Sequence, residues 1–229
     1  MQSPISNTQK HMIFPNVYAL KETQQVRILQ TAIRNKDTSN EDFVFYADRL
    51  VRLLVEEALS FLPCRRKDIE TPTGSFYEGL EPASKICGVS IMRAGESMEK
   101  ALRDTCRGTR IGKILIQRVE HGSYNNTIKE YYCKLPNDIA SRFVLLLDPM
   151  LASGDSASRA TRILIDEYNV REEHIVFVNV ISAPEGLRAY SQRFPNVRII
   201  VGAIDEGLNE QKHIRPGLGD FGDRYFGTN

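Results

Sequence analysis

The chain has 229 residues, of which 41% are hydrophobic and 26% charged, and its 30 Lys and Arg face 29 Asp and Glu. This composition predicts a soluble globular protein with one sizeable core, and the formal net charge of +1 argues against nucleic-acid binding through a chain-wide basic surface. No apolar run approaches the roughly 20 residues of a membrane span. The four cysteines are widely spaced, which predicts reduced thiols and a cytoplasmic location. We therefore expect no nucleic acid and no membrane among the partners.

The first third of the chain predicts helices. Residues 1–22 form an expected arm, and helices are expected over residues 23–35 and 40–62. The second of these helices carries apolar residues at three- and four-residue spacing: Phe43, Ala47, Leu50, Leu54 and Ala58. Residues 63–84 are charged and rich in turn residues, so they are interpreted as a connection.

From residue 85 onward short apolar strands alternate with amphipathic helices, which predicts a mainly parallel sheet flanked by helices. Strands are expected over residues 86–92, 111–117, 143–147, 175–181 and 197–204. Helices are expected over residues 95–106, 156–168 and 185–193. A polar stretch without a clear period, residues 119–138, is typical of a functional insertion. We interpret the chain as a single α/β domain in three parts: residues 1–84, 85–204 and 205–229.

The segment 145–156 is the most informative candidate site, because ligands of parallel sheets bind at the carboxyl ends of strands. An apolar strand ends in Asp148, and a loop of small residues leads into a helix near Ser156. Converging backbone N–H groups and a helix N-terminus favour anions. The pattern therefore indicates a phosphate cradle beside a carboxylate that can hold sugar hydroxyls. The alternative is an ordinary turn in which Ser153 or Ser156 caps the helix.

Two arginines follow predicted strands. Arg93 precedes a small-residue turn, where a guanidinium beside backbone N–H groups suits a pyrophosphate; the alternative is a surface ion pair with a carboxylate. Arg118 enters the polar insertion and would supply a second cation, although a lone arginine at a strand end is usually solvated. The segment 216–227 is dense in Gly, Asp and aromatic residues. It indicates either a flat ligand stacked on Phe221 or a glycine-rich tail with buried aromatics.

Taken together, four segments resemble the uracil phosphoribosyltransferase family, in the family's order and over about residues 13–229. They are residues 88–99, 110–118, 148–152 and 216–223. The long N-terminal helical part and residues 222–227 are most similar to the family's eukaryotic branch. The resemblance implies a type I phosphoribosyltransferase fold, a parallel-sheet core with a small hood. It also implies pyrimidine salvage, in which uracil and phosphoribosyl pyrophosphate (PRPP) give uridine monophosphate (UMP) and pyrophosphate with Mg²⁺.

The resemblance also assigns roles to residues. It places PRPP against Arg93, Ala94, Gly95, Arg118, Asp148, Pro149, Met150, Leu151, Ala152, Ser153, Gly154, Asp155, Ser156 and Asp220. It places uracil against Ile214, Gly219, Asp220 and Phe221, largely through backbone groups. Arg93, Asp148 and Asp220 are the implied catalytic residues, and no protein metal ligand is assigned because PRPP and water would hold Mg²⁺. Residues 119–138 would be a flap over the site, GTP a possible effector, and the assembly a homodimer or homotetramer.

Three positions depart from the family pattern. Asp155 stands where a small residue is usual, residues 119–124 replace an acidic run, and His213 replaces a tyrosine. A carboxylate at position 155 would repel a 5′-phosphate unless its side chain turns outward. The alternative interpretation is therefore a weakened or non-catalytic homologue that binds uracil or nucleotide in a regulatory role.

Overall fold

The computed structural model describes residues 14–121 and 125–228, without the side chains of residues 118–130. The strands of its main sheet are β1 (Val17–Ala19), β4 (Ile86–Met92), β5 (Arg110–His121), β6 (Asn125–Lys134), β7 (Phe143–Leu147), β8 (Met150–Leu151), β9 (Ile175–Ser182) and β10 (Arg198–Ile204). The α-helices are α1 (Gln24–Arg34), α2 (Asn40–Ser60), α3 (Glu99–Thr105), α4 (Asp155–Arg162), α5 (Pro184–Arg193) and α6 (Phe221–Phe226).

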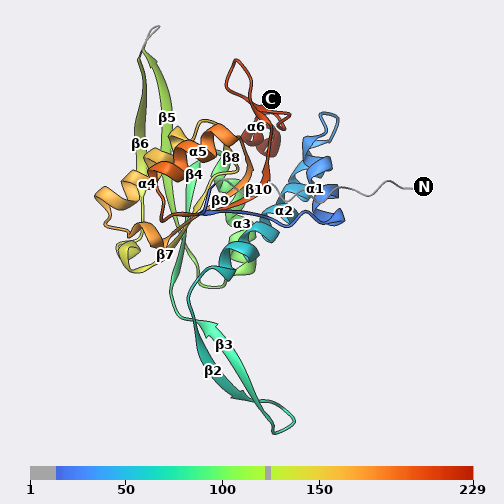
Figure 1. Ribbon diagram of the computed structural model, residues 1–229, viewed down its shortest axis with the longest axis vertical. Coiled ribbons are helices and arrows are strands. Elements are labelled where there is room, and N and C mark those ends of the chain that lie inside the picture. Colours follow the sequence, from blue (N-terminus) through green and yellow to red (C-terminus); the bar gives the residue numbers. More distant parts are fainter. Residues whose placement is uncertain (1–13, 122–124, 229) are drawn as a thin grey trace, which may run out of the picture.

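The strands lie in the order β1, β10, β9, β7, β4, β5, β6, with β8 beside β9 (Figure 1). In the described part of the chain, every pairing in this sheet is parallel except that of β5 with β6. The expected α/β class with a mainly parallel sheet is confirmed.

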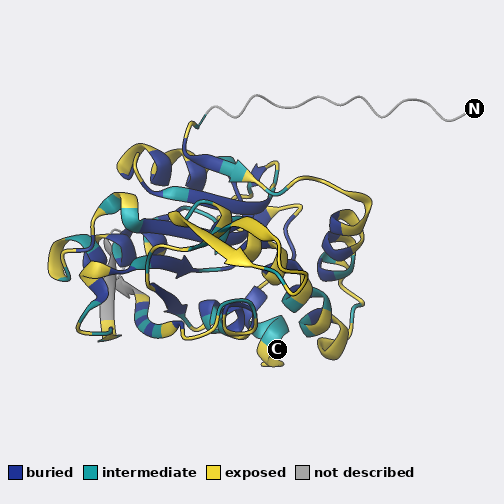
Figure 2. Cartoon of the chain, turned by 90° about the horizontal axis from the view of Figure 1, so that it is seen from below, coloured by how far each residue is buried: buried dark blue, intermediate teal, exposed yellow. Residues whose placement is uncertain are grey.

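Helices cover both faces of this sheet, so its central strands are buried on both sides (Figure 2). Side chains of β9 alternate between the two faces: Val176 and Val178 join the cluster that holds α1, α2, α3 and α6, whereas Ile175 and Phe177 join the cluster that holds α4 and α5. The predicted stripe of α2 is confirmed, because its five residues are all fully buried. The hydroxyl of Ser39 caps this helix by accepting the N–H of Asp42 at 3.2 Å.

Two stretches for which the sequence predicted no strand form antiparallel strand pairs. Residues 63–84, interpreted as a connection, form the antiparallel pair β2 (Cys64–Glu70) and β3 (Phe76–Pro82), which projects from the body of the molecule (Figure 1). The insertion 119–138 largely continues β5 and forms β6. The interpretation of residues 63–84 as a connection was wrong because β2 and β3 are largely exposed and carry few apolar residues, so the alternation that marks a half-buried strand is missing.

Smaller differences occur at element ends. The expected arm contains β1, an edge strand that pairs with β10. The expected helix 95–106 begins as a 3₁₀ turn, η1 (Ala94–Met98), before α3, and α4 passes into a π-helical turn over Ile163–Glu167. The C-terminal part contains the short pair β11 (Gly207–Leu208) and β12 (Ile214–Arg215), followed by α6. None of the helices in the described ranges combines the length and apolar character needed to cross a membrane.

Candidate functional site

The carboxyl ends of β4 and β7 lie side by side, because the two strands pair in parallel. The chain leaves β4 through η1 and α3 on one face of the sheet, and it leaves β7 through α4 on the other. Such a divergence opens a crevice at the strand ends, where ligands of open α/β sheets bind. Arg93 follows β4 and Asp148 follows β7. The fold therefore brings the two main candidate segments to one edge.

The phosphate loop (residues 148–156) is fixed to β9 by hydrogen bonds. The buried amide of Asn179 donates from Nδ2 to the carbonyl of Asp148 at 2.9 Å. The carbonyl of Pro149 accepts the N–H groups of Val180 and Ile181, both at 3.0 Å. The loop also contributes β8, which pairs with the end of β9. Its backbone is thus positioned by the sheet.

The helix α4 begins directly at this loop. Gly154 occupies the N-cap position with a left-handed φ of 83°, and no side chain caps the helix, so the alternative with Ser153 or Ser156 as N-cap is wrong. The first N–H groups of a helix have no intrahelical partner, which leaves α4 suited to an anion. Asp155 lines the same cavity, and one of its oxygens accepts the Ser153 hydroxyl at 2.8 Å. Its negative charge thus stays beside the loop.

Asp148 is half-buried at the mouth of the crevice. Desolvation raises the pKa of its carboxyl to about 7, against the opposing effect of the N–H of Met150, which lies 3.4 Å from Oδ1. A strongly shifted carboxyl in a crevice marks a candidate functional group. Once ionised, it is a strong acceptor for hydroxyl groups.

Arg93, which follows β4, is engaged in an ion pair. Its guanidinium donates to Oδ1 of Asp223 at 2.5 Å and to the hydroxyl of Thr228 at 2.8 Å, and it lies 5.5 Å from the ring centroid of Phe226. The Thr228 hydroxyl and Arg93 together lower the pKa of Asp223. The ion-pair alternative for Arg93 is therefore observed. Since 46% of the Arg93 side chain is exposed, a more highly charged anion can still compete for it.

Ala94 and Gly95 form the turn that follows Arg93, at the start of η1. A Cβ atom on Gly95 would lie 2.3 Å from the carbonyl oxygen of Leu147 at the end of β7. Only glycine fits this approach. The turn is consequently packed directly beside the end of β7, where the phosphate loop begins.

The ribbon formed by β5 and β6 extends well beyond the end of β4 (Figure 1). The last residue of β4, Met92, pairs with Leu115, whereas β5 continues to His121 with β6 as its antiparallel partner. Arg118 pairs through its backbone with Ile128, and its side chain lies outside the described residues. The predicted flap is thus a strand ribbon at the expected edge.

The predicted uracil residues lie at the C-terminal hood. Ile214 is buried and belongs to β12, and Gly219 adopts a left-handed φ of 83°. Phe221 is fully buried, with its ring edge-on to Phe43 at 5.2 Å. The interpretation that Phe221 stacks on a base is therefore wrong, because its ring belongs to the core. A contact at this position would have to come from the backbone.

Residues of the turn before Ile214 also line the site, and of these the sequence analysis singled out only His213, as a departure from the family pattern. Gln211, Lys212 and His213 line one cavity of about 290 Å³ together with the phosphate loop. Lys212 adopts a left-handed φ of 63°, and the side chain of Asn209 accepts the His213 N–H at 2.8 Å. The turn thereby contributes Lys212, a cationic side chain, to the lining of this cavity. The sequence signal for this part of the site was Lys212, a basic residue between the last strand of the sheet and the glycine-rich segment 216–227.

The two acidic residues near the crevice, Asp148 and Asp220, fit a metal cation that is coordinated mainly by the phosphates of a bound substrate. Oδ1 of Asp220 accepts the N–H of Asp223 at 2.9 Å and so caps α6. In the described ranges no group of three or more His, Cys, Asp or Glu side chains could hold a metal ion. Mg²⁺ commonly keeps several waters and binds one or two carboxylates plus substrate phosphates. Asp148 and Asp220 suit that mode.

Comparison with known proteins gives consistent matches. The family model described as uracil phosphoribosyltransferase matches residues 20–228. The chain is 55% identical over 213 residues to "Uracil phosphoribosyltransferase" of Saccharomyces cerevisiae, covering 93% of this chain and 97% of that protein. It is 53% identical over 218 residues to "Uracil phosphoribosyltransferase" of Dictyostelium discoideum, covering 95% and 99%.

Two further matches are to a longer protein and to a solved structure. The chain is 52% identical over 216 residues to "Uridine/cytidine kinase UKL1, chloroplastic" of Arabidopsis thaliana; this covers 94% of the chain but spans only 44% of that longer protein. Among solved structures, the AQ2163 protein from Aquifex aeolicus superposes with a TM-score of 0.79 at 31% identity. The match covers 93% of this chain and 99% of the other.

Proposed function

Because the chain belongs to the uracil phosphoribosyltransferase family, with the type I fold expected of it, we propose that it makes UMP and pyrophosphate from uracil and PRPP in pyrimidine salvage. The observation that carries the proposal is the family match over residues 20–228. That range contains all the residues placed around the crevice. The geometry described above supports a role for each segment.

The phosphate loop and the start of α4 would hold the 5′-phosphate of PRPP. Both features favour an anion, and Lys212, which lines the same cavity, adds a positive charge. Asp148 would accept the ribose hydroxyls, for which its position at the end of β7 is suited. The residues proposed for PRPP are Arg93, Ala94, Gly95, Arg118, Asp148, Pro149, Met150, Leu151, Ala152, Ser153, Gly154, Asp155, Ser156 and Asp220.

The departing pyrophosphate would meet Arg93 and the backbone of Ala94 and Gly95. In glycosyl transfer of this type, positive charge develops on the sugar while negative charge develops on the leaving group. Fixed donors at that position stabilise the transition state more than the ground state. Mg²⁺, when bound with PRPP through Asp148 or Asp220, would neutralise negative charge on the pyrophosphate.

Uracil would lie against the backbone of Ile214, Gly219, Asp220 and Phe221. Backbone N–H and C=O groups can match the donor and acceptor edge of a pyrimidine, and the hood would hold N1 of the base in line with the ribose carbon. The ribbon of β5 and β6 stands where it can exclude water, which would otherwise hydrolyse PRPP.

The direct test is a turnover assay with labelled uracil, PRPP and Mg²⁺. We expect UMP to form, and we expect no product when PRPP is omitted. Cytosine, hypoxanthine and orotate, offered in the same assay, should be poor substrates. Absence of UMP at high enzyme concentration would overturn the proposal.

We also propose a homodimer or homotetramer. The hairpin of β2 and β3 supports this, because Phe76 and Leu80, which lie on the same face of β3, are 81% and 72% exposed, and exposed apolar patches commonly mark interfaces. Sedimentation should show an oligomer that dissociates when Phe76→Ser and Leu80→Ser are combined; a variant that sediments unchanged would exclude the hairpin. The resemblance supports a GTP effector and a cytoplasmic location, and sedimentation with and without GTP tests the former.

A further inference from the structure

The uracil segment (residues 214–221) has little regular structure to hold its shape. It leaves β12 after Arg215 and enters α6 only at Phe221. Between them Gly217 adopts a left-handed φ of 67°, and a Cβ atom there would lie 2.1 Å from the carbonyl oxygen of Ile214. A turn this tight and short of ladder bonds must be fixed by contacts from outside it.

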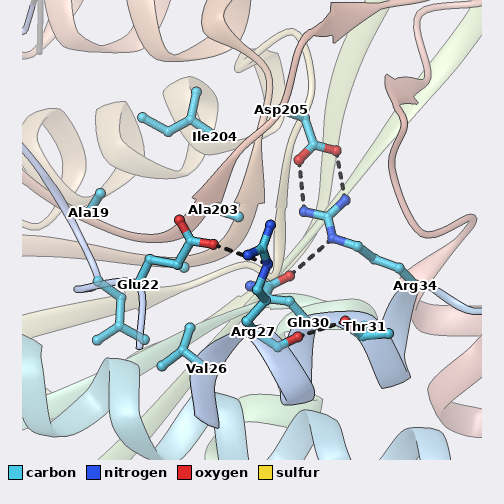
Figure 3. A pocket seen from close by; sticks show the side chains of 12 residues that line it. Ala19, Glu22, Val26, Arg27, Gln30, Thr31, Arg34, Ala203, Ile204 and Asp205 are labelled. Carbon is cyan, nitrogen blue, oxygen red and sulfur yellow. Dashed lines mark hydrogen bonds and ion pairs between the residues drawn. The ribbon is translucent and has the colours of Figure 1, made fainter. Parts of the chain in front are cut away.

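Arg34 and Asp205 supply such contacts (Figure 3). Arg34 Nη1 donates to Asp205 Oδ2 at 2.9 Å, and Nη2 donates to Oδ1 at 2.7 Å. The same pair binds both polar groups of one peptide residue. The N–H of Gly217 donates to Asp205 Oδ2 at 2.8 Å, and its carbonyl accepts from Arg34 Nη1 at 3.1 Å. The position of Gly217 is therefore tied to the geometry of this ion pair.

Each member of the pair is anchored to a different part of the fold. Asp205 follows β10, and its N–H donates to the carbonyl of Ser182 at the end of β9, at 2.9 Å. Arg34 is the last residue of α1, and its Nε donates to Gln30 on the same helix at 3.3 Å. The pair thus joins the sheet, α1 and the uracil segment at one point.

The ion pair is largely shielded from water, since the side chain of Asp205 is 4% exposed and that of Arg34 is 22% exposed. Bidentate contacts between a guanidinium and a carboxylate are directional, and low exposure strengthens them. Arg224 adds a neighbouring tie, because its Nη1 donates to the carbonyls of Leu218 and Ile33 at 2.7 and 2.6 Å. The segment is held to the end of α1 over consecutive residues.

We propose that Arg34 and Asp205 are positioning residues for uracil: they set the place of Gly217 and, through it, the backbone groups of Gly219 and Asp220 that meet the base. This inference rests on the proposed function. Neither side chain belongs to the phosphate loop or to the turn after β4. The pair therefore acts on the base through Gly217 and Gly219, whereas the side chain of Asp220, which is proposed for PRPP, is held separately by the N–H of Asp223.

The test compares KM values for the two substrates in Arg34→Lys, Arg34→Gln and the double variant Arg34→Gln/Asp205→Asn. We expect the KM for uracil to rise roughly tenfold or more, as for misplacement of a reacting group by about an ångström, while the KM for PRPP changes by less than about twofold. Arg34→Lys keeps the positive charge but cannot make the two parallel hydrogen bonds of a guanidinium. This variant should therefore stay folded and still bind uracil weakly.

The double variant separates positioning from stability. Arg34→Gln leaves a buried carboxylate unpaired and should lower the unfolding temperature, and Asp205→Asn added to it should restore much of that loss. Uracil KM should remain high in the double variant because Gly217 is still not held. Arg27→Gln is the matched control: Arg27 lies on α1 and on the same cavity of about 500 Å³, but it pairs with Glu22 at 3.6 Å. Its uracil KM should be unchanged.

The possible outcomes are distinct. An inactive wild-type protein contradicts the proposed function. An active wild type whose folded Arg34 variants keep the wild-type KM for uracil, or lose uracil and PRPP affinity equally, overturns the positioning role. Calorimetric titration with uracil provides the same comparison for any variant that is too slow to assay.

Discussion

The replacement Asp148→Asn should make the ligand-free protein more stable at alkaline pH, although it removes a residue proposed for catalysis. The physical reason is desolvation, which raises the pKa of Asp148 from its ordinary 3.8 to about 7. Below pH 3.8 the carboxyl is protonated in both the folded and the unfolded protein. Between that pH and about 7, only the unfolded chain ionises freely, so the free energy of unfolding falls as pH rises. Asparagine does not titrate and avoids this cost.

The size of the effect follows from the shift. The pKa of Asp148 rises from 3.8 in the unfolded chain to about 7 in the folded protein, and each pKa unit corresponds to about 1.36 kcal/mol. Ionisation of Asp148 therefore lowers the free energy of unfolding by about 4 kcal/mol near pH 8 and by about 2 kcal/mol near pH 5. Asp148 is half-buried, and solvent screening reduces both values. The stability advantage of Asp148→Asn over wild type should therefore be about 2 kcal/mol larger near pH 8 than near pH 5.

Urea unfolding of wild type and Asp148→Asn at both pH values measures this difference. Asp138→Asn is the matched control, because hydrogen bonds from Arg142 lower the pKa of Asp138 to about 2. Its contribution to stability is present above pH 3.8 and lost below it, so the control should be destabilised equally at both pH values. A gain for Asp148→Asn that does not grow with pH would refute the desolvation argument.

The same carboxyl should control the pH profile of turnover. If Asp148 accepts ribose hydroxyls, it must be ionised, and kcat/KM for PRPP should fall as pH decreases through about 7. Asp148→Asn should lower kcat/KM for PRPP roughly tenfold to a hundredfold, the loss expected for hydrogen bonds to a charged group, and should remove this inflection. A profile in the variant with the same inflection would assign the titration to another group.

Three further replacements test the phosphate side of the site. Asp155→Ala should lower the KM for PRPP roughly threefold to tenfold by removing a like charge, whereas Asp42→Ala, in the first turn of α2, should leave it unchanged. Lys212→Gln should raise the KM for PRPP by a similar factor, and an unchanged value would place Lys212 outside the donor site. Gly95→Ala, whose Cβ would lie 2.3 Å from the Leu147 carbonyl, should cost about 1–3 kcal/mol in urea unfolding and weaken PRPP binding; wild-type behaviour in both would refute the packing argument.

The parts of the fold that follow from buried periodic patterns were predictable. The all-buried strand β9 and the stripe of α2 carry signals that burial imposes on sequence. The strand-to-helix segments around Arg93 and Asp148 were also predictable, because a parallel sheet brings their ends together. The hairpin of β2 and β3 was not, since its exposed strands are under no such constraint.

The site was less predictable where side chains act through long-range contacts. Phe221 lies in a glycine-rich segment typical of ligand contact, yet its ring is in the core. Arg34 is an ordinary residue at a helix end until the fold places Asp205, distant in sequence, within 2.7 Å of it. No local sequence pattern predicts this ion pair, because the topology of the fold, and not the spacing of residues along the chain, brings Asp205 to Arg34.

The near-zero net charge of the chain conceals a local balance that bears on donor binding. Arg93 already has Asp223 as its partner, and the cavity that holds Lys212 also holds Asp155. A polyphosphate entering this crevice must therefore replace one carboxylate and approach another, which offsets part of its attraction to the two cations. The affinity for PRPP is then set by a difference between these local terms. It follows that changes to the acidic partners should alter donor affinity as strongly as changes to the basic residues themselves.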